Sequence, residues 1–319
     1  MKIVILDGYG LNPGDMSWQA FEELGEVTVY DRTNNSNPNE VIERIGDAEV
    51  ALTNKTIFTA EIMAACPNLR YIGVLATGYN VVDVVAANQH KIVVTNIPSY
   101  GTDAVAQFTF ALLLEIASQV GEHNASVHQG DWQTNPDFTY WKTPLMELSG
   151  KTLGLVGYGR IAQAVAKIAL AFNMQVIFAN HREKEHPQEI TQVSLTELYQ
   201  QADIISLHVP QFPETEQMIN KEALDQMKPG VILLNTSRGG LIDETDVAQA
   251  LARGQLGAYA ADVVTKEPIA ASNPLLTSPN TYLTPHIAWA PTQTRERLME
   301  IAVNNLAGFS KGQVINQVN

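Results

Sequence analysis

Residues 152–169 read "TLGLVGYGRIAQAVAKIA", and this stretch decides the fold that the sequence predicts. A short apolar run leads into Gly157 and Gly159, after which apolar residues recur at helical spacing from Ile161 onward. Ala162 completes the pattern G-x-G-x-x-A, which is typical of a dinucleotide-binding turn when a strand precedes it and a helix follows it. The alternative is a Gly-rich turn without a ligand, and the strand–helix context argues against that alternative.

Each residue of this pattern is small for a physical reason. Gly157 permits a tight turn, Gly159 has no Cβ to obstruct a pyrophosphate, and Ala162 lets the helix lie close to the sheet. The first residues of the helix, Arg160 and Ile161, would then offer free backbone N–H groups to the phosphates. The sequence therefore predicts a dinucleotide cofactor at this turn.

The rest of the chain predicts two α/β units, because two series of short apolar strands alternate with helical patterns. The first series comprises 2–7, 27–30, 49–52, 71–75 and 91–95, and the second comprises 152–157, 175–179, 204–209, 231–235 and 258–263. Residues 102–120 are apolar on nearly every face and predict a buried helix between the two series. The amphipathic segment 294–309 could return to the first unit, and the polar stretch 31–39 reads as a loop.

Composition limits the classes of partner. The chain of 319 residues has one cysteine, Cys66, which rules out an internal disulfide and favours a reducing compartment, so we expect a cytoplasmic protein. No stretch resembles a signal peptide or a membrane span. The net charge of −14 argues against nucleic acid or an anionic membrane as partner. The alternative is that the charge only keeps the protein soluble. No metal site is predicted.

The residues after the strand at 175–179 bear on the choice of cofactor. An NAD-specific site usually has Asp or Glu about 20 residues beyond the first glycine, where it accepts hydrogen bonds from the ribose 2′-OH. This chain has Asn180, followed by His181 and Arg182. Arg182 could pair with a 2′-phosphate, so we expect NADP(H) to be preferred over NAD(H). The alternative is that Arg182 points into solvent.

Three further segments each follow a predicted strand. Arg238 lies in "LLNTSRGGLID" (233–243), Glu267 in "AADVVTKEP" (260–268) and His286 in "YLTPHIAW" (282–289). Taken singly, the Arg and Glu side chains could be solvated and the His side chain buried. Taken together at one sheet edge, they fit the reduction of a 2-keto acid, with an Arg for the carboxylate and a His as proton donor. A Glu bonded to that His would orient it and favour its protonated form.

The segments "VGYGRIAQ", "NTSRGGLID", "AADVVTKEP" and "TPHIAW" resemble, in order and spacing, the motifs of the D-isomer-specific 2-hydroxyacid dehydrogenases. The resemblance covers nearly the whole chain. It implies that Arg238, Glu267 and His286 form a catalytic triad. It also implies that "ATGYNVVD" (76–83) holds the substrate carboxylate through the backbone N–H groups of Thr77 and Gly78.

The resemblance further implies an α/β fold of two doubly wound parallel-sheet domains. A Rossmann cofactor domain (100–286) would be inserted in a flavodoxin-like substrate domain (1–99 with 287–319). Asp262 would contact the nicotinamide amide, and the protein would be a homodimer in which Trp141 reaches the partner's substrate pocket. The alternative for Trp141 is burial in the interface. The remaining residues implied to line the cofactor are His208, Val209, Pro210, Thr236 and Ser237.

"LTNKT" (52–56), "LATGYNVVD" (75–83) and "HIAWA" (286–290) look most like the glycerate dehydrogenase, or hydroxypyruvate reductase, branch of the family. We therefore expect hydroxypyruvate or glyoxylate as the 2-keto acid. Lys55 could meet a polar group of the substrate, although a solvated Lys is the simpler interpretation. Two alternatives stay open: a family member with a larger keto-acid substrate, and a dinucleotide-sensing protein similar to the C-terminal binding protein corepressors.

Overall fold

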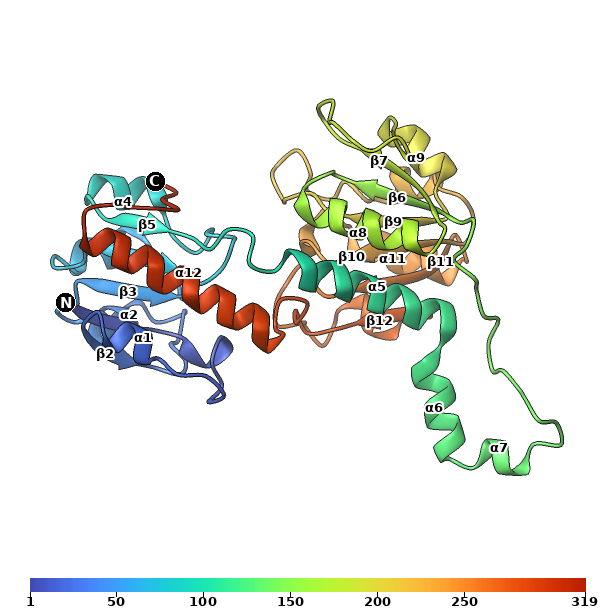
Figure 1. Cartoon of the computed structure of the whole chain (residues 1–319), viewed down its shortest axis with the longest axis horizontal. Helices are drawn as coiled ribbons and strands as arrows, with labels where there is room; N and C mark the ends of the chain where they lie inside the picture. The colour runs from blue at the N-terminus through green and yellow to red at the C-terminus, as the bar shows by residue number, and fades with distance from the viewer. The chain divides into compact units, whose positions relative to one another are not determined.

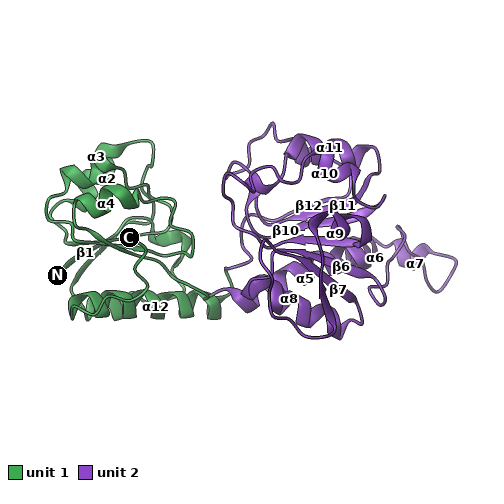
Figure 2. Cartoon of the chain, turned by 90° about the horizontal axis from the view of Figure 1, so that it is seen from above, with its two compact units in different colours: residues 1–100, 290–319 green, residues 101–289 purple.

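The computed structural model describes residues 1–319 as two compact units (Figure 2). Unit 1 is discontinuous and contains residues 1–100 and 290–319, whereas unit 2 contains residues 101–289. The sequence predicted breaks after residues 99 and 286, and the structure has them after Tyr100 and Trp289. Both ends of the chain therefore belong to one unit.

Unit 1 is built on a sheet of five parallel strands in the order β2-β1-β3-β4-β5. In this order β2 lies on one side of β1, and β3, β4 and β5 follow on the other side, as in flavodoxin-like folds. The predicted flavodoxin-like sheet is confirmed. The strands are β1 (Lys2–Ile5), β2 (Glu26–Val29), β3 (Val50–Thr53), β4 (Tyr71–Val74) and β5 (Val93–Thr95).

Helices cover both faces of the unit 1 sheet (Figure 2). One face packs against α2 (Pro38–Ile45), α3 (Ala60–Ala65) and α4 (Val84–Gln89). The C-terminal helix α12 (Thr292–Ser310) covers the other, where Phe309 lies 4.8 Å from Tyr71 between ring centroids. The short η1 (Gly8–Gly10) and α1 (Gln19–Glu22) complete the unit. The predicted loop 31–39 is shorter than expected, since α2 begins at Pro38, which is well suited to a first helical turn.

Unit 2 contains seven parallel strands in the order β12-β11-β10-β9-β6-β7-β8. The order reverses between β6 and β9, which is the arrangement of a doubly wound dinucleotide-binding sheet and confirms the predicted Rossmann fold. The sequence missed β8, an edge strand of three residues. The strands are β6 (Thr152–Val156), β7 (Gln175–Ala179), β8 (Ile190–Gln192), β9 (Ile204–Leu207), β10 (Val231–Asn235), β11 (Leu256–Ala261) and β12 (Thr281–Leu283).

Two helix layers enclose this sheet (Figure 2). On one side lie α5 (Thr102–Ser118) and α8 (Arg160–Ala171), and on the other lie α9 (Leu195–Gln201), α10 (Lys221–Asp225) and α11 (Glu244–Ala252). Two short helices, η2 (Gly239–Leu241) and η3 (Pro274–Thr277), lie in the connections. The glycine-turn helix and the predicted buried helix therefore share one face of the sheet.

The predicted helix 102–120 ends earlier than expected. Gln119 adopts a left-handed conformation (φ 49°), and α6 (Val120–His128) continues at 58° to α5. With α7 (Asp131–Thr134), α6 extends away from the sheet of unit 2 (Figure 1). No single helix is long and apolar enough to cross a membrane, and only the bent pair α5 and α6 meets that test jointly.

Candidate active site

The glycine turn between β6 and α8 has the shape that a pyrophosphate needs. Gly157 has φ +90°, and a Cβ there would lie 2.7 Å from the carbonyl oxygen of His208, so no larger residue fits. At Gly159 a Cβ would meet no atom within 4 Å, which leaves open space beside the backbone. The first N–H groups of α8, at Arg160 and Ile161, have no partner within the helix. Ala162 is fully buried against the sheet, and these residues fit the pyrophosphate of a dinucleotide.

The loop after β7 carries the residues predicted to select the cofactor. Asn180 donates from Nδ2 to the carbonyl oxygen of Arg182 at 2.9 Å. The side chains of His181 and Arg182 are exposed, and the Arg182 guanidinium pairs with no group of the chain. No carboxylate stands at the end of β7, so this position lacks the group that would accept a hydrogen bond from a ribose 2′-OH.

Two side chains predicted to line the cofactor connect the end of β10 to its neighbours. Ser237 donates from Oγ to the carbonyl oxygen of Leu207 at 2.7 Å, and the Thr236 hydroxyl lies 3.0 Å from that of Thr109 in α5. Both side chains therefore stabilise the edge of the sheet where β9 and β10 end.

His208 follows β9 and lies 2.9 Å from the Ser206 hydroxyl through Nε2. Burial lowers the pKa of His208 to about 4, so its imidazole is neutral near pH 7. The next residues, Val209 and Pro210, continue along the same edge, where a Cβ on Gly157 would meet Val209 at 2.8 Å.

The turn that carries Arg238 is held by a buried amide. Asn235 donates from Nδ2 to the carbonyl oxygen of Arg238 at 2.8 Å, and its Oδ1 accepts from the N–H of Ser237 at 3.0 Å. A Cβ on Gly239 would lie 1.9 Å from the carbonyl carbon of Val264, so this turn lies directly against the loop after β11. The Arg238 side chain is exposed and donates to the carbonyl oxygen of Ser237 at 2.7 Å.

Glu267 and His286 form a direct pair. Glu267 Oε2 lies 2.7 Å from His286 Nδ1, and the two side chains are 34% and 28% exposed. A carboxylate at Nδ1 requires that nitrogen to carry a proton, which leaves Nε2 as the ring atom directed to other groups. The pair therefore presents one imidazole nitrogen in a fixed orientation.

The backbone of His286 is unusual, with φ +56°, the left-handed region that a non-glycine residue rarely adopts. Three contacts hold it there. The His286 N–H donates to the carbonyl oxygen of Thr284 at 3.0 Å, and its carbonyl oxygen accepts from Trp289 Nε1 at 2.8 Å. The third contact comes from Asp262, whose carboxylate holds the residues on either side.

Asp262 is 1% exposed and accepts hydrogen bonds from three donors of the His286 segment. Its Oδ1 accepts from Thr284 Oγ1 at 2.7 Å and from the N–H of Ile287 at 2.8 Å, and its Oδ2 accepts from the N–H of Ala288 at 2.7 Å. The family resemblance implies a contact between Asp262 and the nicotinamide amide. The structure directs both carboxylate oxygens to the segment that carries His286.

In unit 1, the residues predicted to hold the substrate carboxylate follow β4. Thr77 donates from Oγ1 to the carbonyl oxygen of Ile97 at 2.8 Å, and its own carbonyl oxygen accepts from Asn96 Nδ2 at 2.8 Å. The backbone N–H groups of Thr77 and Gly78 have no acceptor in the chain. Trp141, in the segment after α7 of unit 2, is 64% exposed.

Residues 110–288 match the family described as D-isomer specific 2-hydroxyacid dehydrogenase, NAD binding domain. The chain belongs to this family. The dehydrogenase is 54% identical to a hydroxypyruvate reductase from Blautia hydrogenotrophica over 100% of both chains. It is 36% identical to a glycerate dehydrogenase from Methylorubrum extorquens, over 99% of this chain and 98% of that one. These similarities confirm the predicted branch of the family.

A solved structure resembles the dehydrogenase closely as well. An NADPH-dependent glyoxylate/hydroxypyruvate reductase from Sinorhizobium meliloti superposes with a TM-score of 0.85 and 28% identity, covering 99% of this chain and 97% of that one. The predicted class of enzyme, an oxidoreductase with a nicotinamide dinucleotide, agrees with this neighbour and with the matched NAD-binding domain.

The structure brings only some of the predicted site residues of the dehydrogenase into contact. Glu267 and His286 are paired directly, whereas the Arg238 side chain bonds its own turn. Sequence reasoning missed two further features. One is the set of contacts that Asp262 and Trp289 make to the His286 segment. The other is Asp7, which accepts from the backbone N–H groups of the 54–56 loop. The only local signal for Asp7 was its place at the end of a strand.

Proposed function

We propose that this dehydrogenase reduces hydroxypyruvate or glyoxylate to the corresponding D-2-hydroxy acid with NAD(P)H. The observation that carries the proposal is the contact between Glu267 Oε2 and His286 Nδ1, which leaves Nε2 free to take up and transfer a proton. The names of the similar proteins, a hydroxypyruvate reductase, a glycerate dehydrogenase and a glyoxylate/hydroxypyruvate reductase, support this substrate class.

In this proposal the chain's own residues bind the keto acid and move one proton. When bound, the reduced nicotinamide supplies a hydride to the carbonyl carbon. Arg238 binds the substrate carboxylate with two parallel N–H groups, and His286 gives the proton on Nε2 to the carbonyl oxygen as negative charge develops there. Glu267 keeps the imidazole oriented and stabilises its charged form. The free backbone N–H groups of Thr77 and Gly78 are the contacts that unit 1 is proposed to offer the substrate.

We propose that NADP(H) is the preferred cofactor. The open space at Gly159 and the free N–H groups of α8 support pyrophosphate binding at this turn. The exposed guanidinium of Arg182, together with Asn180 in place of an acidic residue, supports recognition of a 2′-phosphate. The NADPH dependence of the Sinorhizobium meliloti enzyme is in line with this choice. The other proposed cofactor contacts are His181, His208, Val209, Pro210, Thr236 and Ser237.

We also propose that the protein is a cytoplasmic homodimer. The arm formed by α6, α7 and the segment after them carries exposed apolar side chains, among them Val120, Trp132, Phe138 and Leu145. A second copy of the chain would cover them, and Trp141 of one copy would reach the substrate pocket of the other. Sedimentation velocity of the wild-type protein and of Phe138→Ser tests this, because a monomeric wild type would contradict it.

Initial rates of cofactor oxidation test the proposed activity. Purified protein would be supplied with NADH or NADPH, each combined with hydroxypyruvate, glyoxylate, pyruvate or phenylpyruvate. We expect fast turnover of hydroxypyruvate or glyoxylate and a higher kcat/KM with NADPH. Turnover of phenylpyruvate alone would assign a larger substrate, and tight cofactor binding without turnover would assign a dinucleotide sensor.

Two variants test the roles of individual residues. His286→Ala should lower kcat by about 10²–10⁴, the usual contribution of a positioned proton donor. Arg238→Ala should mainly raise KM for the keto acid, because the substrate carboxylate loses its cationic partner. Full activity of His286→Ala would contradict the proton-donor assignment.

A further inference from the structure

The loop between β7 and β8 is shaped by two side-chain amides. Asn180 Nδ2 and Gln192 Nε2 both donate to the carbonyl oxygen of Arg182, each at 2.9 Å. The other end of the Gln192 amide accepts from the backbone N–H of Lys184 at 3.0 Å. These hydrogen bonds close the loop around Arg182, with two of them meeting at a single carbonyl oxygen.

The chemistry of this loop requires amides at both positions. The Arg182 carbonyl can only accept and the Lys184 N–H can only donate, so Gln192 must donate from its nitrogen and accept with its oxygen. A Glu at 192 or an Asp at 180 would place an oxygen against the carbonyl oxygen of Arg182. An Asp at 180, the position where an NAD-specific site would have a carboxylate, would therefore lose the hydrogen bond that Asn180 makes to this loop.

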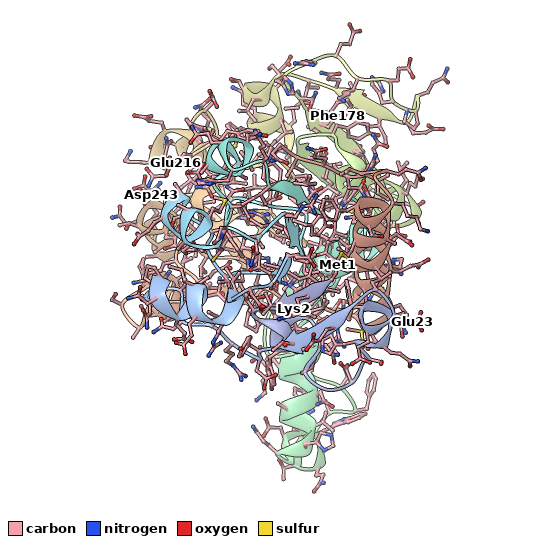
Figure 3. All side chains as sticks on the ribbon, turned by 90° about the vertical axis from the view of Figure 1, so that its left-hand side faces the viewer. Met1, Lys2, Glu23, Phe178, Glu216 and Asp243 are labelled. Atoms are coloured by element: carbon pink, nitrogen blue, oxygen red, sulfur yellow. The ribbon has the colours of Figure 1, made fainter.

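Gln192 is also tied to the glycine turn through the core. It is the last residue of β8 and pairs in register with Phe178 of β7. Phe178, labelled in Figure 3, stacks on Tyr158 of the glycine turn with ring centroids 3.9 Å apart. The next N–H, of Val193, donates to the Phe178 carbonyl oxygen at 2.9 Å. The loop is thus anchored to the same strands that carry the glycine turn.

We propose that Gln192 is a positioning residue for cofactor selection, holding the Arg182 carbonyl so that the Arg182 guanidinium faces the 2′-phosphate of NADP(H). This inference rests on the proposed preference for NADP(H). Gln192 itself touches no part of the cofactor. Its effect comes from preorganisation, because a loop already folded around Arg182 loses less conformational freedom when the phosphate binds.

Gln192→Met tests the proposal, since Met keeps the length of the side chain and removes its donor and acceptor. We expect kcat/KM for NADPH to fall about tenfold, which corresponds to about 1.4 kcal/mol, with kcat/KM for NADH within about twofold of wild type. Gln188→Met is the matched control, because Gln188 is exposed in the same loop and its side chain makes no hydrogen bond. An equal loss with both cofactors, or no loss with NADPH, would overturn the proposal.

A double-mutant cycle with Arg182→Met separates a positioning role from a general structural one. If Gln192 acts through Arg182, Gln192→Met should leave the NADPH/NADH ratio of kcat/KM unchanged in the Arg182→Met background. Additive losses would contradict the proposal. A loss of NADPH preference in Arg182→Met but not in Gln192→Met would refute this inference alone. A wild type that does not prefer NADPH, and in which Arg182→Met changes nothing, would refute both the inference and the proposed NADP(H) preference.

Discussion

Asp262→Asn perturbs the link between the sheet and the proposed proton donor. The carboxylate accepts three hydrogen bonds from the segment that holds His286, and it is 1% exposed. Asn has the same shape but only one acceptor oxygen. If that oxygen keeps the donors at Thr284 and Ile287, the amide NH₂ faces the N–H of Ala288, and two donors oppose each other.

The magnitude follows from these contacts. The Ala288 N–H belongs to a residue that is 3% exposed, and leaving it without an acceptor costs about 1–3 kcal/mol. The two remaining bonds change from charged to neutral acceptors, which weakens each by about 1 kcal/mol. Together these terms predict a loss of roughly 3–5 kcal/mol for the native His286 segment. Displacement of His286 by about 1 Å would lower kcat by about 10².

Steady-state kinetics and cofactor binding check this prediction. We expect Asp262→Asn to lower kcat with little change in the Kd for NADPH measured by cofactor fluorescence. Asp31→Asn serves as the control, because Asp31 is exposed and its carboxylate makes no hydrogen bond. A variant with wild-type kcat and a raised Kd for NADPH would refute the reasoning and assign Asp262 to the nicotinamide amide.

Three further predictions concern individual side chains. His208 has a pKa of about 4 in the folded protein against 6.5 when unfolded. The unfolded state therefore binds a proton first as pH falls, and stability is lost between pH 6.5 and 4. The loss is at most about 3 kcal/mol, because the residue keeps some exposure. Urea unfolding at pH 7 and at pH 4.5 measures it, and between these two pH values His208→Gln should lose less free energy of unfolding than the wild type. Gly239→Ala should destabilise unit 2 by about 1–3 kcal/mol, because its Cβ would lie 1.9 Å from a Val264 backbone atom. Gly10→Ala is the control, because a Cβ at Gly10 meets no atom within 4 Å and should leave stability unchanged. Equal melting temperatures of the two variants would contradict this prediction. Glu267→Gln should lower kcat at least about tenfold without raising KM for NADPH, because a neutral amide stabilises the charged His286 ring less, and an unchanged kcat would exclude that role.

The strand–turn–helix at 152–169 was predictable because its determinants are local. Gly157 needs its positive φ within the turn itself, and the apolar spacing of α8 lies within one helix. The alternation of apolar strands with helices likewise fixed the two parallel sheets. By contrast, the break of the predicted helix at Gln119 carries no proline or glycine at the break itself, and β8 is too short to show a period.

The sequence by itself determined the two α/β sheets and the glycine turn, and its family motifs predicted Arg238, Glu267 and His286 as site residues. Only the tertiary structure decided what holds these residues. Asp262 accepts a hydrogen bond from Ala288, which lies 26 residues further along the chain, and so helps to hold the segment of His286. In the loop after β7, Gln192 likewise donates to Arg182, 10 residues before it. Hydrogen bonds of this kind depend on where adjacent strands place their loops, and that register is set by packing of the whole sheet rather than by the propensity of any segment. The left-handed backbone of His286 is strained locally, and the distant Asp262 holds it together with the nearby Thr284 and Trp289.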